Sequence, residues 1–161
     1  EEEKMIGIIS DTHDNVDNVI KAVKIFKERN VDIVIHAGDI VAPPTAMQFE
    51  GLKTIFIKGN NDGQVSGLRS KIGEIGCSFY EDIAEIEHDG KKIAVTHYPD
   101  KARELAKTGK YDFVVYGHDH RKNDENISNT KIINPGAHHW KSEGTIAFLD
   151  EKTGSVEFLR L

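Results

Sequence analysis

Five short segments of the sequence place aspartate, asparagine or histidine at the end of an apolar run. They are Asp11-Thr12-His13, Gly38-Asp39, Gly59-Asn60-Asn61-Asp62, Thr96-His97 and Gly117-His118-Asp119-His120. Several contain a glycine, which lets the chain turn sharply where a strand ends. Each segment taken singly is common, but five of them in order along one chain indicate a single site built from strand ends.

The chemistry of this set is that of a metal site. It offers two aspartates, one asparagine and four histidines, and no thiolate. Imidazole and carboxylate ligands suit borderline divalent ions. Seven ligands are too many for one catalytic ion with open positions, but they suit two ions that share a bridging carboxylate. Two such ions can clamp a phosphoryl group and turn a bridging water into a nucleophile.

Composition excludes several other classes of protein. The chain has 161 residues and a formal net charge of -6, which argues against wrapping nucleic acid by surface charge alone, so nucleic acid is expected only as a substrate. The single cysteine, Cys77, excludes a disulfide framework and a cysteine-based zinc site. No apolar stretch approaches the ~20 residues that span a bilayer. The acidic start of the sequence is unlike a signal peptide. We expect a soluble, cytoplasmic protein without a membrane partner.

The pattern of apolar residues predicts an α/β fold in one domain, residues 1–161. Short β-rich runs are expected as strands at 5–9, 31–35, 55–57, 93–95, 113–116, 132–133, 146–149 and 156–159. Helices are expected at 16–26, from Pro43, at 64–76 and at 100–107. Hairpins are expected around Asp89-Gly90 and around residues 152–154. The first half suggests parallel βαβ units, and the second half a mixed or antiparallel sheet. Ligands of open α/β sheets bind beyond the carboxyl ends of strands, so the five segments should converge on one edge.

The order of these segments resembles that of the calcineurin-like metallophosphoesterases. The Gly-Asn-Asn-Asp form, the short length and Asn134-Pro135-Gly136 are similar to the small YfcE-type bacterial and archaeal branch. The resemblance implies a four-layer α/β/β/α sandwich, in which two mixed β-sheets are flanked by helices. It also implies a small phosphate-ester substrate and two divalent metal ions per chain, with Mn²⁺ as the first choice and Ni²⁺, Fe²⁺, Co²⁺ or Zn²⁺ as alternatives.

The resemblance implies a role for each residue of the set. Asp11, His13 and His120 would bind the first metal, and Asn60, His97 and His118 the second. Asp39 would bridge both metals, and a hydroxide between them would attack the phosphate ester.

Asn61 departs from the pattern of the larger phosphatases in this family, in which a histidine is thought to protonate the leaving group. An asparagine amide can donate a hydrogen bond to a phosphoryl oxygen but cannot deliver a proton. General-acid assistance, worth ~10²–10⁴-fold, should therefore be weak, and substrates with acidic leaving groups should be favoured. His138 and His139 are candidates for another acid. Asp62 is expected either to orient Asn61 or to cap the helix that follows.

Three functions are compatible with these residues. A phosphodiesterase is preferred. A phosphomonoesterase, including a nucleotide or protein phosphatase, would use the same metals. A non-catalytic scaffold is the third, because a eukaryotic retromer subunit uses this fold mainly to bind proteins. The complete ligand set favours an enzyme. A homodimer is compatible with a domain of this size.

Residues outside the set have simpler interpretations. His36 is expected to pack within a strand, and His88 to be solvated beside a turn. Tyr98 and Trp140 are expected either at the rim of the site or in ordinary packing. Cys77 is expected to be buried and inert.

Overall fold

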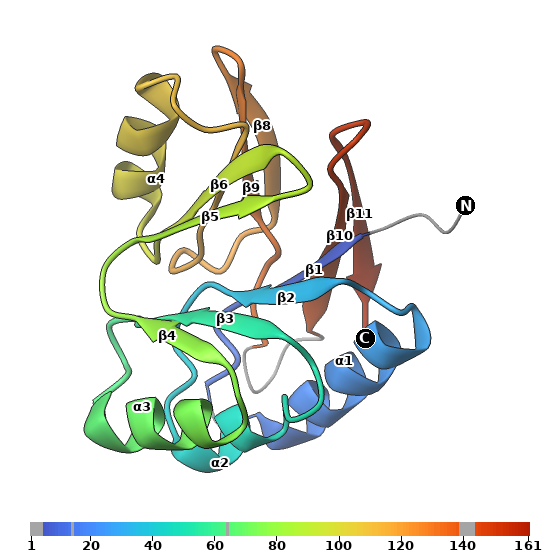
Figure 1. The fold of residues 1–161 in the computed structure, drawn as a ribbon, viewed down its shortest axis with the longest axis vertical. Helices are drawn as coiled ribbons and strands as arrows, with labels where there is room; N and C mark the ends of the chain where they lie inside the picture. The colour runs from blue at the N-terminus through green and yellow to red at the C-terminus, as the bar shows by residue number, and fades with distance from the viewer. Residues whose placement is uncertain (1–4, 14, 64, 139–143) are drawn as a thin grey trace.

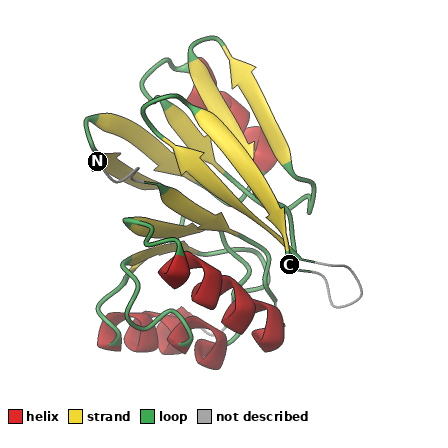
Figure 2. Ribbon diagram, turned by 90° about the vertical axis from the view of Figure 1, so that its right-hand side faces the viewer, coloured by secondary structure: helices red, strands yellow, loops and turns green. Residues whose placement is uncertain are grey.

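The computed structural model describes residues 5–13, 15–63, 65–138 and 144–161, and these form four layers. Two β-sheets pack face to face, three helices cover the outer face of one sheet, and a fourth helix covers the other (Figures 1 and 2). The expected α/β/β/α sandwich with two mixed sheets is therefore confirmed.

The first sheet, sheet A, contains six strands. In spatial order they are β11 (Ser155–Arg160), β10 (Thr145–Asp150), β1 (Ile6–Ile9), β2 (Ile33–His36), β3 (Thr54–Ile57) and β4 (Ser78–Tyr80). Strands β1, β2, β3 and β4 run parallel, and β10 and β11 add an antiparallel hairpin beside β1. Its outer face carries α1 (Val16–Glu28), α2 (Pro43–Met47) and α3 (Val65–Glu74).

The second sheet, sheet B, contains five strands. In spatial order they are β5 (Ala84–His88), β6 (Lys91–Val95), β7 (Phe113–Val115), β9 (Thr130–Asn134) and β8 (Asn123–Ile127). Its three central strands are parallel, and each edge strand pairs antiparallel with its neighbour. Helix α4 (Pro99–Lys107) covers its outer face.

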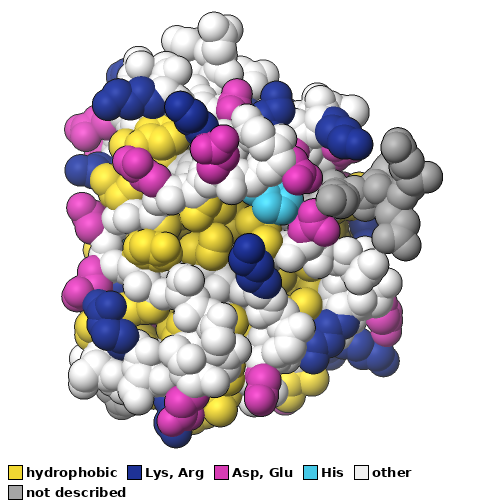
Figure 3. Space-filling model, in the orientation of Figure 1, with side chains coloured by type: hydrophobic (Ala, Val, Ile, Leu, Met, Phe, Trp, Pro, Cys, Tyr) yellow, Lys and Arg dark blue, Asp and Glu magenta, His cyan; other side chains and the backbone are white. Residues whose placement is uncertain are grey.

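Alternating strand residues fill three apolar layers. Ile6 and Ile8 of β1 face the layer between the two sheets, whereas Ile9 faces the layer beneath α1, α2 and α3. A third, smaller layer lies between sheet B and α4. Because the central strands are buried on both faces, they appear in the sequence as continuous apolar runs. Figure 3 shows that hydrophobic side chains also gather along one open side between the two sheets.

Helix α1 forms where the sequence predicts it and for the expected reason. Val19, Ala22, Val23 and Phe26 follow a three-or-four residue spacing and are all buried. The side chain of Asn15 caps the helix by accepting a hydrogen bond from the backbone N–H of Asn18, at 3.2 Å.

Two features of the strands were not given by the sequence. The five site-bearing strands are divided between the sheets, since β1, β2 and β3 belong to sheet A and β6 and β7 to sheet B. Strands β4 and β8 were not predicted. Both are edge strands in which exposed and partly buried residues alternate, so neither carries an apolar run.

None of the helices in the described part of the chain is both long enough and apolar enough to cross a bilayer.

Replacement of Gly7 by alanine tests the packing of α1 on β1. A Cβ at Gly7 would lie 2.6 Å from the ring of Phe26, which is fully buried. We expect Gly7→Ala to lower the free energy of unfolding by about 1–3 kcal/mol, as overpacking does. Urea denaturation measures this change.

Gly73→Ala in α3 is the matched control, because a Cβ there meets nothing within 4 Å. Alanine favours helix, so this control should gain about 0.5–1 kcal/mol. Equal stabilities of the two variants would contradict the packing described for Gly7.

Candidate metal centre

The backbone that carries the predicted ligands is held in an unusual conformation. Five of the seven residues have positive φ angles: Asp11 (52°), His13 (48°), Asp39 (60°), His118 (75°) and His120 (62°). Non-glycine residues adopt this region at a cost of roughly 1–3 kcal/mol each when it is strained. Such conformations cluster at functional sites, because only surrounding contacts can maintain them.

Two glycines allow the strand ends to approach one another. A Cβ at Gly59 would lie 2.2 Å from Asp39 Oδ1, and one at Gly117 would lie 2.5 Å from Asp11 Oδ2. Neither glycine has a positive φ, so glycine is needed at these two positions because the neighbouring loops come too close for a Cβ, and not because the chain makes a sharp turn. Gly38, with a φ of 106°, does make the turn that the sequence suggests.

Asp11 is fully buried, and one of its carboxylate oxygens is available to bind a metal ion. Its Oδ2 accepts hydrogen bonds from Ser10 Oγ at 2.6 Å and from the backbone N–H of His118 at 3.0 Å. Its buried Oδ1 has no hydrogen-bond partner among the described residues, and lies 3.5 Å from His120 Nε2. Burial raises the pKa of Asp11, although its hydrogen bond from Ser10 and the nearby His97 oppose this.

His13 completes a first group of ligand atoms. Its buried Nε2 also lacks a hydrogen-bond partner in the described part of the chain, and it lies 4.0 Å from Asp39 Oδ2. Asp11, His13, Asp39 and His120 each offer one ligand atom, and these atoms all lie within 4.8 Å of one another.

Asn60, His97 and His118 form a second group. Asn60 Oδ1 lies 2.9 Å from His97 Nε2 and 3.2 Å from His118 Nδ1. His97 Nδ1–H donates to the backbone carbonyl of Ala37 at 2.7 Å, which leaves Nε2 facing the site. Hydrogen bonds of this kind orient metal-binding histidines.

Asp39 lies between the two groups. Its Oδ2 is 3.5 Å from His97 Nε2 in one group and 4.0 Å from His13 Nε2 in the other. Burial alone would raise the pKa of Asp39, but hydrogen bonds from His97 and Asn61 lower it overall. Burial alone would lower the pKa of His97, but its hydrogen bond with Asp39 outweighs burial, so the pKa of His97 is raised overall.

These features fit divalent cations. Two buried ligand atoms, Asp11 Oδ1 and His13 Nε2, have no hydrogen-bond partner in the described part of the chain and face a group of imidazoles and carboxylates. Leaving such atoms unpaired is costly, whereas a cation between them would satisfy both.

Asn61 holds the Asp39 carboxylate through both of its nitrogens. The backbone N–H donates to Oδ1 at 2.8 Å, and Nδ2 donates to Oδ2 at 3.0 Å. Asn61 is exposed, and its amide therefore lies where a solvent-borne substrate can meet it.

Asp62 has a role that neither expectation anticipated. Its carboxylate accepts three backbone hydrogen bonds, from Gly59 at 2.7 Å, Asp39 at 3.0 Å and Val41 at 2.6 Å. The side chain is buried and ties the loop after β3 to the loop after β2. Asp62 thus positions Asn60 and Asp39 together.

Two further positioning residues were not recognised from the sequence as part of the site. Asn134 Nδ2 donates to Asp119 Oδ1 at 2.9 Å and so holds the loop that carries His118 and His120. Ser10 orients the Asp11 carboxylate, as described above. The signal for Ser10 was its position directly before a strand-end segment, and the signal for Asn134 was its place in the Asn134-Pro135-Gly136 segment that carries part of the family resemblance.

His36 is a packed strand residue, as expected. It is fully buried, its Nδ1 accepts from the backbone N–H of Gly38 at 3.1 Å, and its Nε2 lies 2.9 Å from Thr12 Oγ1. Burial and the neighbouring His138 lower the pKa of His36 to about 3, so the ring is neutral.

His138 is poorly placed for the acid role considered above. It is fully buried, it accepts a hydrogen bond from Asn18 Nδ2 at 3.3 Å, and burial lowers its pKa to about 4. His139 and Trp140 lie outside the described residues.

The structure agrees with some of the interpretations of residues outside the ligand set and contradicts others. Tyr98 is 43% exposed and its ring lies 5.0 Å from that of His118, so it forms part of the rim of the site. Cys77 is only partly buried, and its thiol faces the carbonyl of Leu52. The expectation that His88 is solvated was wrong, because its side chain is only 16% exposed and contacts Glu151 and Asp32.

Comparison with known proteins agrees with this geometry. The sequence model of the calcineurin-like phosphoesterase superfamily domain matches residues 5–154. The chain belongs to this superfamily. A phosphodiesterase of Methanocaldococcus jannaschii, MJ0936, is 40% identical over 136 residues, which cover 81% of this chain and 82% of that protein.

Solved structures show the same superfamily fold. One described as a novel archaeal phosphodiesterase superposes with a TM-score of 0.91 and 34% identity, covering 98% of this chain and 99% of that one. The phosphoesterase YfcE of E. coli has a TM-score of 0.68 at 13% identity, covering 96% and 98%. A single mutant (D62A) of Vps29 from Entamoeba histolytica has a TM-score of 0.65 at 14% identity, covering 98% of both chains.

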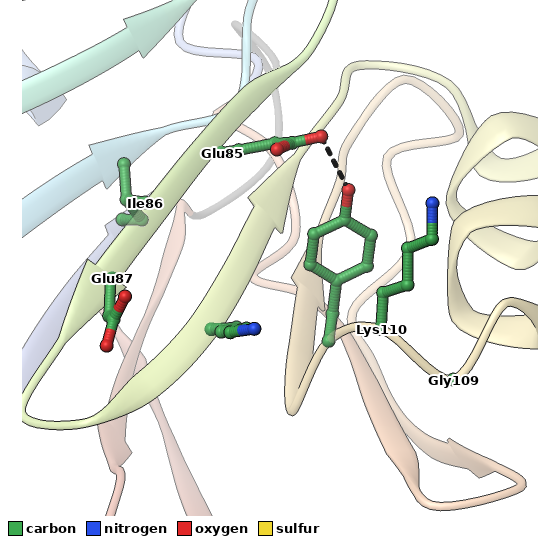
Figure 4. Close-up of a pocket in the computed structure, with 7 residues that line it drawn as sticks. Glu85, Ile86, Glu87, Gly109 and Lys110 are labelled. Atoms are coloured by element: carbon green, nitrogen blue, oxygen red, sulfur yellow. Dashed lines mark hydrogen bonds between the residues drawn. The ribbon is translucent and has the colours of Figure 1, made fainter.

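A pocket of about 540 Å³ lies apart from the residues of the candidate metal site. Figure 4 shows Glu85, Ile86 and Glu87 of β5 on one side and Gly109 and Lys110 on the other. Tyr111 closes part of it by donating a hydrogen bond to Glu85 Oε1 at 2.7 Å. None of the seven predicted ligands is among its lining residues.

Replacement of Asp62 by asparagine tests the link between the two loops. An amide offers one acceptor oxygen in place of two, so backbone N–H groups lose partners. We expect a loss of roughly 1.5–3 kcal/mol of stability, as for hydrogen bonds to a charged group. Mn²⁺ affinity should fall about 10–100-fold, as for residues that orient ligands. Urea denaturation and equilibrium dialysis measure these two quantities.

The exposed Asp82, replaced by asparagine in the same way, is the control and should change stability by less than about 0.5 kcal/mol. If the two variants behaved alike, Asp62 would not position the site.

Acid should destabilise the metal-free protein through His36. Its pKa is lowered from 6.5 to about 3, so between these values the unfolded chain binds a proton that the folded chain does not. Stability should therefore fall as the pH falls through this window, by up to about 1.4 kcal/mol per pH unit. Urea denaturation across the window should show a shallower slope for His36→Gln. Parallel slopes for the two proteins would contradict a neutral buried His36.

Proposed function

We propose that this protein is a phosphodiesterase that requires two divalent metal ions. One observation carries the proposal: seven side chains of metal-ligand type, from two different sheets, converge, and two of their buried ligand atoms have no hydrogen-bond partner among the described residues. Superfamily membership and the 40% identity with a phosphodiesterase support it.

We propose the following ligands. Asp11, His13 and His120 would hold one ion, Asn60, His97 and His118 the other, and Asp39 would contact both. Mn²⁺ is the first choice, since the set mixes imidazole with carboxylate and amide oxygens; Ni²⁺, Fe²⁺, Co²⁺ and Zn²⁺ are alternatives. Bound there, two such ions polarise phosphoryl oxygens and lower the pKa of water.

The residues of the chain supply position and hydrogen bonding. Asn61 directs an exposed amide at the site, and this amide can donate to a phosphoryl oxygen while its backbone N–H holds Asp39. Ser10, Asp62 and Asn134 keep the ligand-bearing loops in place through the contacts described above. Preorganised groups of this kind need no rearrangement during the reaction.

Two features favour a diester over an unactivated monoester. Asn61 has no proton to deliver, and the buried His138 has a pKa near 4, so help for a poor leaving group is weak. The exposed ring of Tyr98, 5.0 Å from that of His118, also gives an apolar surface on which a second ester substituent can rest.

Hydrolysis of aryl phosphodiesters with leaving groups of different acidity tests this function. The protein is stripped with a chelator and reloaded with Mn²⁺, and monoesters of the same alcohols are compared. We expect metal-dependent diester turnover that rises as the leaving group becomes more acidic. Asp39→Asn should lower the rate by at least roughly 10–100-fold, the loss typical even of groups that only orient ligands.

Asp82→Asn is again the control and should keep the full rate, because Asp82 lies on an exposed bend. A rate independent of leaving-group acidity would point to another acid. A protein that binds two ions tightly yet hydrolyses neither type of ester would contradict the catalytic function and favour a scaffold.

A further inference from the structure

A second cluster of histidine and carboxylates lies at the opposite edge of the sandwich. Asp32 comes directly before β2, and Glu151 directly follows β10, which runs antiparallel to β1. His88 ends β5, which runs antiparallel to β6, and Asp89 begins the turn between these strands. All four residues therefore lie at the amino-terminal edge of the central strands, whereas the site described above lies at their carboxyl ends.

The His88 ring lies between carboxylates on both of its nitrogens. Its Nδ1 lies 2.5 Å from Glu151 Oε1 and 3.9 Å from Asp89 Oδ2. Its Nε2 lies 3.4 Å from Asp32 Oδ2. Asp32, His88 and Asp89 each offer a ligand atom, and these atoms are within 4.8 Å of one another.

Glu151 gives an independent indication of a missing partner. The residue is only 4% exposed, and one oxygen, Oε1, faces His88. The other oxygen, Oε2, is buried and has no hydrogen-bond partner among the described residues. A buried carboxylate oxygen without a partner is costly. Burial also raises the pKa of Glu151, and the charges of Asp89 and Asp32 add to this.

The charges of the cluster are unbalanced. Among the described residues, three carboxylates surround one imidazole, so negative charge is in excess. A divalent cation would remove this excess and could satisfy the unpartnered oxygen of Glu151. Imidazole combined with carboxylates suits ions such as Zn²⁺ and Mn²⁺.

We propose that His88 Nδ1, Glu151 and Asp89 bind a divalent cation, and that Asp32 accepts a hydrogen bond from His88 Nε2–H. A carboxylate in this outer position fixes the tautomer that leaves the other nitrogen for the metal. The ion would be structural, because it is remote from the phosphoesterase site.

Such an ion would join the two sheets. His88 and Asp89 belong to the β5–β6 hairpin of sheet B, whereas Glu151 and Asp32 flank strands of sheet A. A cavity of about 190 Å³ lies beside the cluster and is lined by Ile33, Ile55 and Ile86 together with His88. It lies where the apolar layer between the sheets reaches the surface (Figure 3). An ion bound to this cluster would therefore cross-link sheet A and sheet B where the apolar layer between them reaches the surface.

Metal content per chain tests the proposal. Metal-free protein and its variants are dialysed to equilibrium against Zn²⁺, and bound zinc is counted by elemental analysis. We expect Glu151→Gln to bind one equivalent less than the wild type. Asp32→Asn should bind the same equivalent about 10–100-fold more weakly. Thermal unfolding should show a smaller stabilisation by Zn²⁺ in both variants.

Two further variants guard against misfolding and unspecific binding. Asp89→Asn removes a ligand from an exposed turn with a φ of 48°, which asparagine adopts readily, so it should fold normally and still bind this zinc ion more weakly. Asp82→Asn should bind as the wild type does. Diesterase activity with Mn²⁺ should be unchanged in all four variants, which separates this site from the catalytic one.

Equal zinc content and equal affinity in the wild type, Glu151→Gln and Asp89→Asn would overturn the proposal. His88 would then only make hydrogen bonds with the neighbouring carboxylates and would not bind a metal.

Discussion

The structure depends on keeping two aspartates, Asp11 and Asp39, in its interior at the meeting point of two sheets. Burying a carboxylate is costly unless donors or cations compensate it. The chain supplies part of the compensation through Ser10, Asn61 and the backbone N–H of His118. Asp11 Oδ1 nevertheless has no hydrogen-bond partner among the residues that the structure describes. The imidazoles around it are arranged as metal ligands would be, and a divalent cation bound there would compensate the remaining negative charge.

The unusual backbone of the site follows from this constraint. Carboxylates from different strands can meet only if the loops that carry them come within van der Waals contact. Gly59 and Gly117 permit that approach, and the left-handed conformations of Asp39 and His118 turn their side chains into the site. Asp62 and Asn134 maintain these conformations with hydrogen bonds between loops. Strain is tolerated here because the sheets beneath are buried on both faces and rigid.

The four-layer arrangement gives the molecule two chemically different edges. At the carboxyl ends of the central strands, histidines and carboxylates from both sheets converge on an accessible site. At the opposite edge the apolar layer between the sheets opens to the surface, beside a histidine enclosed by acidic side chains. A cluster of histidine and carboxylate side chains thus lies at each edge of the two sheets, and the apolar layer between the sheets separates the two clusters.

The sequence alone was sufficient to predict which residue types end the strands, the amphipathic helix α1, both hairpins and, by resemblance, the layered fold; the assignment of metal ligands stays a prediction. These depend on local periodicity and on the order of short segments. The tertiary structure decided what depends on contacts between distant segments. Such contacts divided the site between two sheets and gave Asp62 its three backbone donors. Within the described residues, they also left Asp11 Oδ1 and His13 Nε2 without hydrogen-bond partners. They also buried His88 against Glu151, 63 residues away, and paired the polar edge strands β4 and β8. No local pattern carries this information, because each partner lies in another part of the chain.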